Sequence, residues 1–275
     1  MIDSNLFVFD IETIPDIESA RSMLHLPNSI NDQEVLEALS KYHDPSKKTE
    51  DVFYKPIFHK VVAISFAEIE ITKEEGKEAL VLKNIRSGGK VDSKESDLIK
   101  GFFHYIGNHL PRLVSYNGRS FDMPVLKFRA LKYGIGTEIY NAGDKWNSYL
   151  QRYSSNWHCD LHEVLTDYYA AGKMRLNELC ATLGYPGKID VDGGSVYELH
   201  KEGKIQEIRD YCETDVLNTY LVYLNYALHY GIINKETFAI SIAQIVNFLE
   251  KNKDQEHWAK FLSSWEDIDS NEMTA

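Results

Sequence analysis

The sequence predicts an α/β domain built on a mixed β-sheet that is flanked by α-helices. Three observations lead to this prediction: a continuous apolar run at residues 6–9, a strand-like run at residues 60–71, and helical periodicity from residue 93 onward. Short apolar runs bounded by charges or turns are typical of strands, whereas apolar residues three or four positions apart are typical of helices. In chain order the elements are three strands, a helix, a strand and further helices, which is the order of a mixed-sheet α/β domain.

The first strand is expected at residues 6–9 (LFVF), where the apolar run breaks at DIET. A continuous run of this kind is typical of a central strand that is buried on both faces. The second strand is expected at Lys60–Ile71 and the third at Glu78–Ile85, joined as a hairpin across a turn at Gly76. The first strand would end in charged residues, and an α/β site usually opens at such a strand end.

The segment from Pro15 to Pro56 is mixed and polar, and it is interpreted as an insertion over or beside the site. One helix is expected in it at residues 32–43, with Asp32 as its capping residue. The later elements, in order, are a helix capped by Ser93, a strand in RLVSYNG, a helix from Phe121 to Gly134, a strand and a helix in HCDLHEVL, a helix in RLNELCATLGY and a long helix containing residues 207–224.

The domain is expected to span residues 1–230, with the insertion at about residues 15–57. Residues 235–262 carry an apolar helical stripe, which predicts helices that pack back onto the domain; a helix that binds a partner protein is the alternative. Residues 266–275 are expected to form a frayed tail. Residues 231–275 are therefore interpreted as a helical extension followed by a flexible tail.

Composition and charge limit the class of protein. A hydrophobic content of 43% in 275 residues is enough for an ordinary globular core. The net charge of -12 argues against a broad basic surface that holds long duplexes, but it leaves open a nucleic acid that is bound at its end. The three cysteines lack the spacing of a zinc site, and the N-terminus carries acids where a secretory signal would carry bases. No apolar run approaches the ~20 residues of a membrane span. The sequence therefore predicts a cytoplasmic protein without membrane contact.

Asp10 and Glu12, in FDIET, form the first group of candidate site residues. The period of two in a strand puts both side chains on the same face. Like charges this close repel unless a cation lies between them. A salt-bridged pair on a surface strand is the alternative interpretation, but the position directly after a buried run favours a functional pair.

Asp122, in YNGRSFDMP, is the second candidate. It precedes a helix that has Pro124 in its first turn, so a plain helix N-cap is one interpretation. In the other interpretation Asp122 is a further carboxylate at the mouth of the sheet, Gly118 permits close approach of the backbone, and Asn117 offers an amide to a ligand.

Tyr211 and Asp215, in the helix EIRDYCETDVLNTYLVYL, form the third group. Four residues at about 100° each bring the two side chains to nearly the same direction, roughly 6 Å apart along the helix axis. An exposed carboxylate beside a core-edge aromatic is the alternative interpretation. In the functional interpretation, the phenol and the carboxylate face one site together.

The three groups together supply four carboxylates: Asp10, Glu12, Asp122 and Asp215. Oxygen-only ligation of this kind suits Mg²⁺ or Mn²⁺ rather than zinc. Four acids without local cationic partners indicate two metal ions about 3.5 to 4 Å apart, which is the geometry for in-line attack on a phosphodiester.

FDIET, NGRSFD and YCETD stand in the order and with the spacing of the three exonuclease motifs of the DEDD superfamily, whose fold is RNase H-like. The Tyr-x-x-x-Asp form of the third motif is that of the DEDDy branch; the sister branch has histidine one residue earlier, where this chain has Asp210. Over about residues 5–230 the sequence resembles the predicted 3′ to 5′ exonucleases related to the proofreading domain of family B DNA polymerases.

The resemblance implies a role for each of the candidate residues. Asp10, Glu12 and Asp215 would hold the metal ion that carries the attacking water. Asp10 and Asp122 would hold the ion at the leaving 3′ oxygen, Asp122 directly or through a water. Tyr211 would orient the attacking water by a hydrogen bond, because a phenol with an ordinary pKa of about 10 is a poor base at neutral pH.

Ile14, Asn117 and Lys188 are the candidate contacts to the substrate. Lys188 could touch a phosphate, although a loop lysine that is merely exposed is the alternative. Asp160 lies at the end of an expected strand. It would either support the site from behind the metal ligands or cap the helix that follows.

His158 and His162 have a spacing that two metal ligands on a helix can have, but no third ligand accompanies them. They are therefore interpreted as structural. The aromatic cluster at residues 146–157 could stack unpaired bases. Packing of these rings in the core or in a loop is the favoured interpretation.

The predicted function is a metal-dependent 3′ to 5′ exonuclease that acts on single-stranded or frayed DNA ends, uses two Mg²⁺ or Mn²⁺ ions and releases nucleoside 5′-monophosphates. RNA is the main alternative substrate, since no motif here reads the 2′-hydroxyl. A non-catalytic module that binds nucleic acid or a polymerase is the alternative from another class. The chain is far too short for a polymerase palm and fingers, so any proofreading role would act in trans with a polymerase or repair partner.

Overall fold

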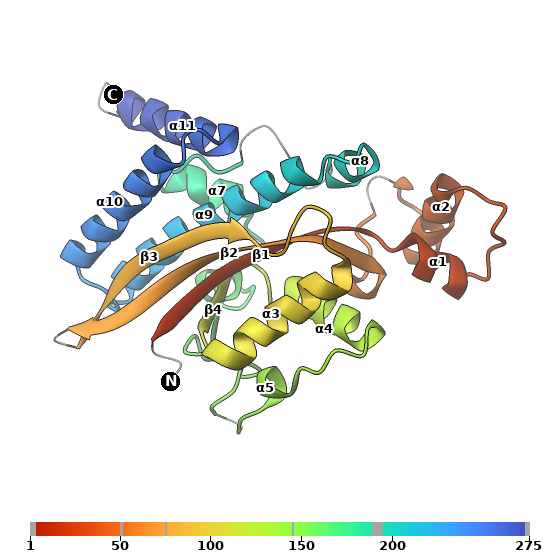
Figure 1. Ribbon diagram of the computed structural model, residues 1–275, viewed down its shortest axis with the longest axis horizontal. Coiled ribbons are helices and arrows are strands. Elements are labelled where there is room, and N and C mark those ends of the chain that lie inside the picture. Colours follow the sequence, from red (N-terminus) through yellow and green to blue (C-terminus); the bar gives the residue numbers. More distant parts are fainter. Residues whose placement is uncertain (1–3, 50–51, 75, 145, 189–194, 273–275) are drawn as a thin grey trace.

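The computed structural model describes residues 4–49, 52–74, 76–144, 146–188 and 195–272. Its centre is a five-stranded mixed sheet with the order β3-β2-β1-β4-β5 (Figure 1). The strands are β1 (Asn5–Pro15), β2 (His59–Glu74), β3 (Lys77–Ser87), β4 (Arg112–Ser115) and β5 (His158–Asp160). β1, β2 and β3 pair in antiparallel fashion, whereas β1, β4 and β5 pair in parallel. This mixed sheet confirms the predicted RNase H-like α/β fold.

Helices cover both faces of the sheet. Along β1, Leu6 and Val8 pack on the side of α9 (Ile205–His229), and Phe7 and Phe9 pack on the side of α3 (Glu95–His109) and α4 (Asp122–Lys132). The alternation follows from the period of two in a strand. The other helices are α1 (Ile17–Met23), α2 (Asp32–His43), η2 (Pro56–Phe58), α5 (Glu138–Asn141), α6 (Leu161–Leu165), α7 (Leu176–Thr182), α8 (Val196–Lys201), α10 (Lys235–Lys251) and α11 (Glu256–Glu272).

β1 does not end at Asp10, as the sequence predicted, but continues to Pro15. It continues because it stays paired with β2 over its whole length, up to the pair Pro15 and His59. Its parallel pairing with β4, by contrast, stops at Val8. Beyond Val8 the edge of β1 that faced β4 has no neighbouring strand among the described residues, and the carboxylates of the first motif lie along this unpaired stretch.

In the segment between β1 and β2, the described residues 16–49 and 52–58 contain two α-helices where one was expected. Asp16 caps α1, since its side chain accepts hydrogen bonds from the backbone N–H (3.2 Å) and hydroxyl (2.6 Å) of Ser19. The prediction that Asp32 caps α2 was wrong. Asn31 is the cap, and it forms a reciprocal capping box with Glu34 at 2.9 and 3.0 Å.

The start of α3 also differs from the prediction. Ser93 does not cap this helix; its hydroxyl accepts the N–H of Lys90 (2.8 Å) and closes the turn before it. Glu95, in the first turn, reaches across to accept the N–H of Val61 (2.7 Å) and to bind Arg129 of α4. The helix start is thus stabilised by tertiary contacts, which a local capping pattern does not reveal.

The β2–β3 hairpin and the packing of the C-terminal helices agree with the prediction. β2 and β3 pair around the turn at Gly76, whose φ of 79° is a left-handed conformation that suits glycine. α10 and α11 pack back onto α9, with Ile245, Leu249 and Trp258 fully buried. They lie at the end of the molecule away from α1 and α2 (Figure 1). α11 continues to Glu272, so most of the expected frayed tail is helical; residues 273–275 lie outside the described residues.

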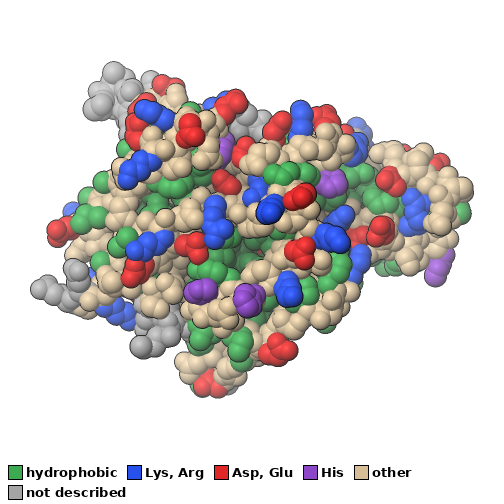
Figure 2. Space-filling view, viewed as in Figure 1, with side chains coloured by type: hydrophobic (Ala, Val, Ile, Leu, Met, Phe, Trp, Pro, Cys, Tyr) green, Lys and Arg blue, Asp and Glu red, His purple; other side chains and the backbone are tan. Residues whose placement is uncertain are grey.

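The surface carries both signs of charge. On the face drawn in Figure 2, lysine and arginine side chains are interspersed with aspartate and glutamate. This mixture agrees with the net charge of -12, which argues against a broad basic surface for long duplexes. Across the part of the chain that the structure describes, none of the helices combines the length and the apolar character that a membrane crossing requires.

Candidate active site

The four predicted carboxylates come from three elements around the part of β1 that extends beyond its pairing with β4. Asp10 and Glu12 continue the series of Leu6 and Val8, so they project toward α9. One carboxylate oxygen of each lies within 4.8 Å of the other and of the Cys212 sulfur on α9. Asp122 comes from the first turn of α4 and Asp215 from α9, and both act electrostatically on Asp10 and Glu12.

Burial raises the pKa of every carboxylate in this group, and repulsion from the other members adds to the shift at Asp10 and Glu12. For Asp10 the largest cause is burial, followed by the negative charges of Asp122, Glu12 and Asp215. Burial likewise raises the pKa of Asp122 to about 7, although hydrogen bonds from the backbone at Asp122 and Ile11 oppose the shift. Four clustered acids are thus unfavourable as anions unless positive charge compensates them.

Asp215 supplies a direct test of whether a cation fits this group. Its carboxylate is buried, and its Oδ1 atom has no hydrogen-bond partner among the described residues. A buried oxygen without a partner is costly in a folded protein, and a bound ion is one explanation for such an atom. The donor set is entirely carboxylate oxygen, which suits Mg²⁺ or Mn²⁺. The four residues therefore fit hard divalent cations.

Tyr211 lies one helical turn before Asp215, and the two side chains interact as the helix period predicts. The phenol donates a hydrogen bond to Asp215 and accepts one from the ammonium of Lys188 (2.6 Å). Burial, followed by the charges of Asp215, Glu12 and Asp10, raises the pKa of Tyr211 far above its ordinary value. Tyr211 is consequently a neutral phenol at physiological pH, suited to hydrogen bonding rather than to proton abstraction.

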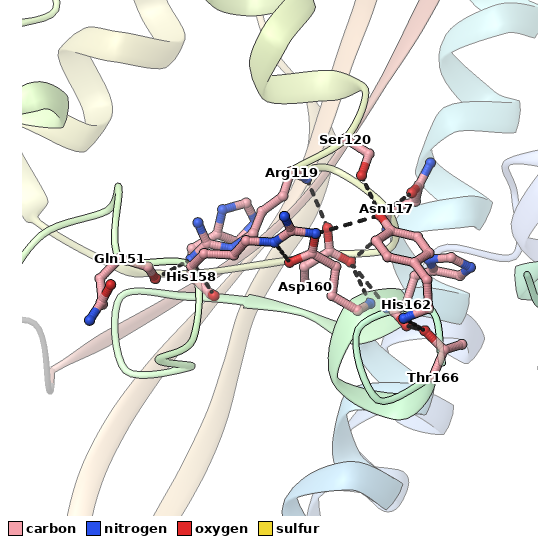
Figure 3. A network of polar contacts seen from close by, with 11 residues as sticks. Asn117, Arg119, Ser120, Gln151, His158, Asp160, His162 and Thr166 are labelled. Carbon is pink, nitrogen blue, oxygen red and sulfur yellow. Dashed lines mark hydrogen bonds and ion pairs between the residues drawn. The ribbon is translucent and has the colours of Figure 1, made fainter. Parts of the chain in front are cut away.

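Asp160 holds the loop that leads to Asp122 (Figure 3). It caps α6 through the N–H groups of His162 (3.1 Å) and Glu163 (3.3 Å), as one interpretation of the sequence predicted. The same carboxylate accepts the N–H groups of Asn117 (2.9 Å) and Arg119 (2.8 Å). Asn117 has a φ of 64°, so this buried acid stabilises a left-handed residue in the loop.

The two histidines form hydrogen bonds within the fold, and the rings of the aromatic cluster are partly packed and partly exposed. His158 shares a hydrogen bond with Ser115 (2.7 Å), and the His162 ring accepts the N–H of Met174 (3.3 Å). These contacts agree with the structural interpretation of both histidines. In the aromatic cluster, Tyr149 is buried and packs on Trp157, whereas Trp146 and Tyr153 are exposed.

A cavity of about 1140 Å³ opens beside the carboxylates. Asp10 and Asp215 line it, together with two of the predicted substrate contacts, Asn117 and Lys188. The third, Ile14, is buried and lines a different cavity, of about 760 Å³. It follows that Ile14 is separated from the other two candidates, while Asn117 and Lys188 face the same space as the acids.

Comparison with protein families matches residues 51–265 to a family described as "Predicted 3'-5' exonuclease related to the exonuclease domain of PolB". The match covers well over half of the chain. The chain belongs to this family. The matched part of the chain contains Asp122, Tyr211 and Asp215 and begins after Asp10 and Glu12. A search among curated proteins found no match.

Several further side chains line the cavity without having been predicted from the sequence. They are Phe53, Tyr116, Ser120, Phe121, Tyr169 and the segment 173–178, which includes Lys173 and Arg175. Ser120 and Phe121 belong to the second motif, NGRSFD, whereas the others lie outside the three motifs. Their one local signal is the mixture of aromatic and basic residues near residues 169–175, because that combination is typical of surfaces that bind single-stranded nucleic acid.

Proposed function

We propose that the protein is a DEDDy-type, metal-dependent 3′ to 5′ exonuclease. It removes nucleotides from the 3′ end of single-stranded or frayed DNA and releases nucleoside 5′-monophosphates. The observation that supports this proposal most is the cluster of four carboxylates, three of them buried and Asp10 partly buried, whose pKa values are all raised by burial, with mutual repulsion adding to the shift at Asp10 and Glu12. Such a cluster is unfavourable in the absence of cations and is suited to the binding of two of them.

In this proposal Asp10, Glu12 and Asp215 hold one divalent cation, and Asp10 and Asp122 hold the other. Two Mg²⁺ or Mn²⁺ ions bound there would stabilise the charge that develops on the phosphate and lower the pKa of the attacking water. The buried, unpartnered Oδ1 of Asp215 supports the assignment of that residue as a ligand. Asp160 would act indirectly, because its hydrogen bonds fix the loop before Asp122.

Tyr211 and Lys188 would position the reacting groups. The phenol is fixed between Asp215 and Lys188, and its oxygen can accept a hydrogen bond from the attacking water. The positive charge of Lys188 lowers the pKa values of Asp10, Glu12 and Asp215, which opposes the effect of burial. Lys188 therefore helps to keep these acids ionised, and it is close enough to the site to contact a phosphate.

Replacing Tyr211 by phenylalanine is expected to lower kcat by about 10- to 100-fold, or ~1.4–2.7 kcal/mol, because the water loses one positioning hydrogen bond. KM should change little, since the phenyl ring remains. Steady-state hydrolysis of a single-stranded oligonucleotide measures both constants. Tyr226→Phe is the matched control, because Tyr226 is on the same helix and its hydroxyl bonds to Ser155 instead. A Tyr211→Phe enzyme with the kcat of wild type would argue against the positioning role.

The substrate class is tested with DNA and RNA single strands of one sequence. A higher kcat/KM on DNA supports the proposal, whereas a higher value on RNA would assign the activity to an exoribonuclease. Tight binding of both strands without turnover in Mg²⁺ and in Mn²⁺ would instead indicate a non-catalytic binding module. Product analysis completes the test, because the proposed reaction yields nucleoside 5′-monophosphates only.

A further inference from the structure

Phe53 is an exposed aromatic side chain at the cavity that contains Asp10 and Asp215. Its side chain is 72% exposed, and it belongs to the segment between β1 and β2, shortly before η2. An isolated exposed phenylalanine is ordinary on a protein surface. Phe53 differs because its ring lines the cavity of the proposed catalytic carboxylates, and no step of the proposed reaction uses it.

Two other rings support Phe53 from beneath. Its centroid lies 5.2 Å from that of Phe121 and 5.5 Å from that of His59. The latter two rings meet edge to face at 4.9 Å. His59 is fixed in turn, because Thr13 bonds to its Nδ1 atom (2.9 Å) and the Tyr54 carbonyl to its Nε2 atom (3.2 Å). The exposed ring is therefore held by an ordered base.

This base is joined to the first two motifs. Phe121 directly precedes Asp122, and Thr13, the hydrogen-bond partner of His59, directly follows Glu12. The position of the Phe53 ring is thus linked to two separate elements that carry the proposed metal ligands. Although this ring adds little to the core, since most of it is in contact with solvent, its placement relative to the carboxylates is well defined.

The same cavity offers positive charge for a nucleic-acid backbone. Lys173 and Arg175 line it and are exposed; Glu178 is the acid beside them. Single-stranded nucleic acids are bound by this combination of features, in which bases stack on aromatic rings and cations track the phosphates. With a net charge of -12, the protein as a whole does not attract nucleic acid. The local pair of cations therefore favours binding of a strand at this cavity.

We propose that Phe53 is a stacking platform for an unpaired base at the 3′ end of the substrate strand. It is a specificity-determining residue, because an unpaired base can present its face to the ring, whereas a base within a duplex stacks on its neighbours. This inference rests on the proposed function, since it takes the terminal phosphodiester to lie at the four carboxylates. Phe53 itself contacts the base and takes no part in the hydrolysis.

The test uses a DNA single strand with the fluorescent base 2-aminopurine at its 3′ terminus. Binding is measured in Ca²⁺, after checking that the strand stays intact. Wild type is expected to quench the fluorescence, because stacking on an aromatic ring quenches this base. Phe53→Ala should abolish the quenching and weaken binding by about 5- to 150-fold, which corresponds to the ~1–3 kcal/mol of one base stack. Phe53→Trp should retain both.

Phe128→Ala is the matched control, since Phe128 is an exposed phenylalanine that does not line the cavity. It should quench and bind as wild type does. Phe53→Ala should keep the melting temperature of wild type, because most of the Phe53 side chain is exposed. Quenching and affinity of Phe53→Ala equal to those of wild type would overturn the inference.

Hydrolysis in Mg²⁺ separates this inference from the proposed function. A wild-type enzyme that degrades the strand, combined with a Phe53→Ala variant of unchanged KM and unchanged preference for single strands over blunt duplexes, would overturn the role of Phe53 alone. A wild type that quenches 2-aminopurine but cleaves nothing in Mg²⁺ or Mn²⁺ would overturn the exonuclease proposal and leave base stacking supported.

Discussion

Replacing Asp10 by asparagine is expected to lower kcat by at least ~10³-fold and, in metal-free protein, to raise the melting temperature. Activity falls because the proposed site loses a ligand to both cations, and every ~1.4 kcal/mol of lost transition-state stabilisation is tenfold in rate. Stability rises because Asp10 lies, partly buried, beside Asp122, Glu12 and Asp215, and removal of one charge relieves their repulsion. Relief of ~1 kcal/mol would shift the melting temperature by about 2 °C or more.

Single-turnover hydrolysis and thermal unfolding in chelator measure the two effects of Asp10→Asn. Asp92→Asn is the control, because Asp92 is an exposed loop acid, and it should change neither. Mn²⁺ should raise the melting temperature of wild type more than that of Asp10→Asn, since a ligand stabilises the state that binds it. An inactive Asp10→Asn protein that melts earlier than wild type without metal would instead make Asp10 a structural residue.

Replacing Arg129 by leucine is expected to reduce the free energy of unfolding by ~3–5 kcal/mol. The Arg129 guanidinium is buried and bonds to both oxygens of Glu95 (2.7 and 2.5 Å) and to Asp16. It thereby joins α4 to α3 and to the cap of α1. Without Arg129, the carboxylates of Glu95 and Asp16 remain buried with fewer partners. An uncompensated buried charge destabilises the protein by more than the intact ion pairs stabilise it. Chemical denaturation at neutral pH measures the change.

Lys132→Leu provides the comparison for Arg129→Leu. Lys132 lies on the same helix and also pairs with Asp16 (2.9 Å), but its side chain is 37% exposed. Its loss should therefore cost about 1 kcal/mol or less. If the free energies of unfolding of the two variants differ by less than ~1 kcal/mol, burial does not govern how much these ion pairs stabilise the fold.

The ion pairs of Arg129 and Lys132 with Asp16 predict a loss of stability in acid. Burial alone would raise the pKa of Asp16, but hydrogen bonds from Ser19, Lys132 and Arg129 outweigh it and hold the pKa well below its ordinary value. A carboxylate with a lowered pKa in the folded state stabilises the protein above the unfolded-state pKa of about 4 and loses this contribution as the pH falls. The destabilisation caused by Arg129→Leu should therefore shrink below about pH 4.

Local patterns in the sequence predicted most of the sheet, because strand alternation and turn residues act over a few positions. The β2–β3 hairpin at Gly76 is an example. The true length of β1 could not be predicted in this way, since its continuation past Asp10 depends on pairing with β2, some fifty residues away in the chain. α1 was missed because its seven residues include a single buried one, Ala20, and so carry no apolar stripe.

The candidate site was predictable as far as its chemistry lies in short motifs. Asp10 and Glu12 share a face through the strand period, and Tyr211 meets Asp215 through the helix period. The contact between Lys188 and Tyr211 was not predicted, because it joins a loop to a helix 23 positions away. Phe53 was missed for a related reason: an exposed ring has no periodic signal, and its position depends on contacts with Phe121 and His59.

The most direct measurement is the time course of cleavage of a 5′-labelled DNA single strand in Mg²⁺ or Mn²⁺, with wild type and Asp215→Ala side by side. We predict a ladder that shortens from the 3′ end with wild type, and no ladder with Asp215→Ala or in the presence of chelator. The buried Oδ1 of Asp215 has no hydrogen-bond partner among the described residues. Comparing wild type with Asp215→Ala therefore tests whether Asp215 is a metal ligand. Equal ladders from both proteins, or an intact strand with wild type, would contradict a two-metal exonuclease site built on these four carboxylates.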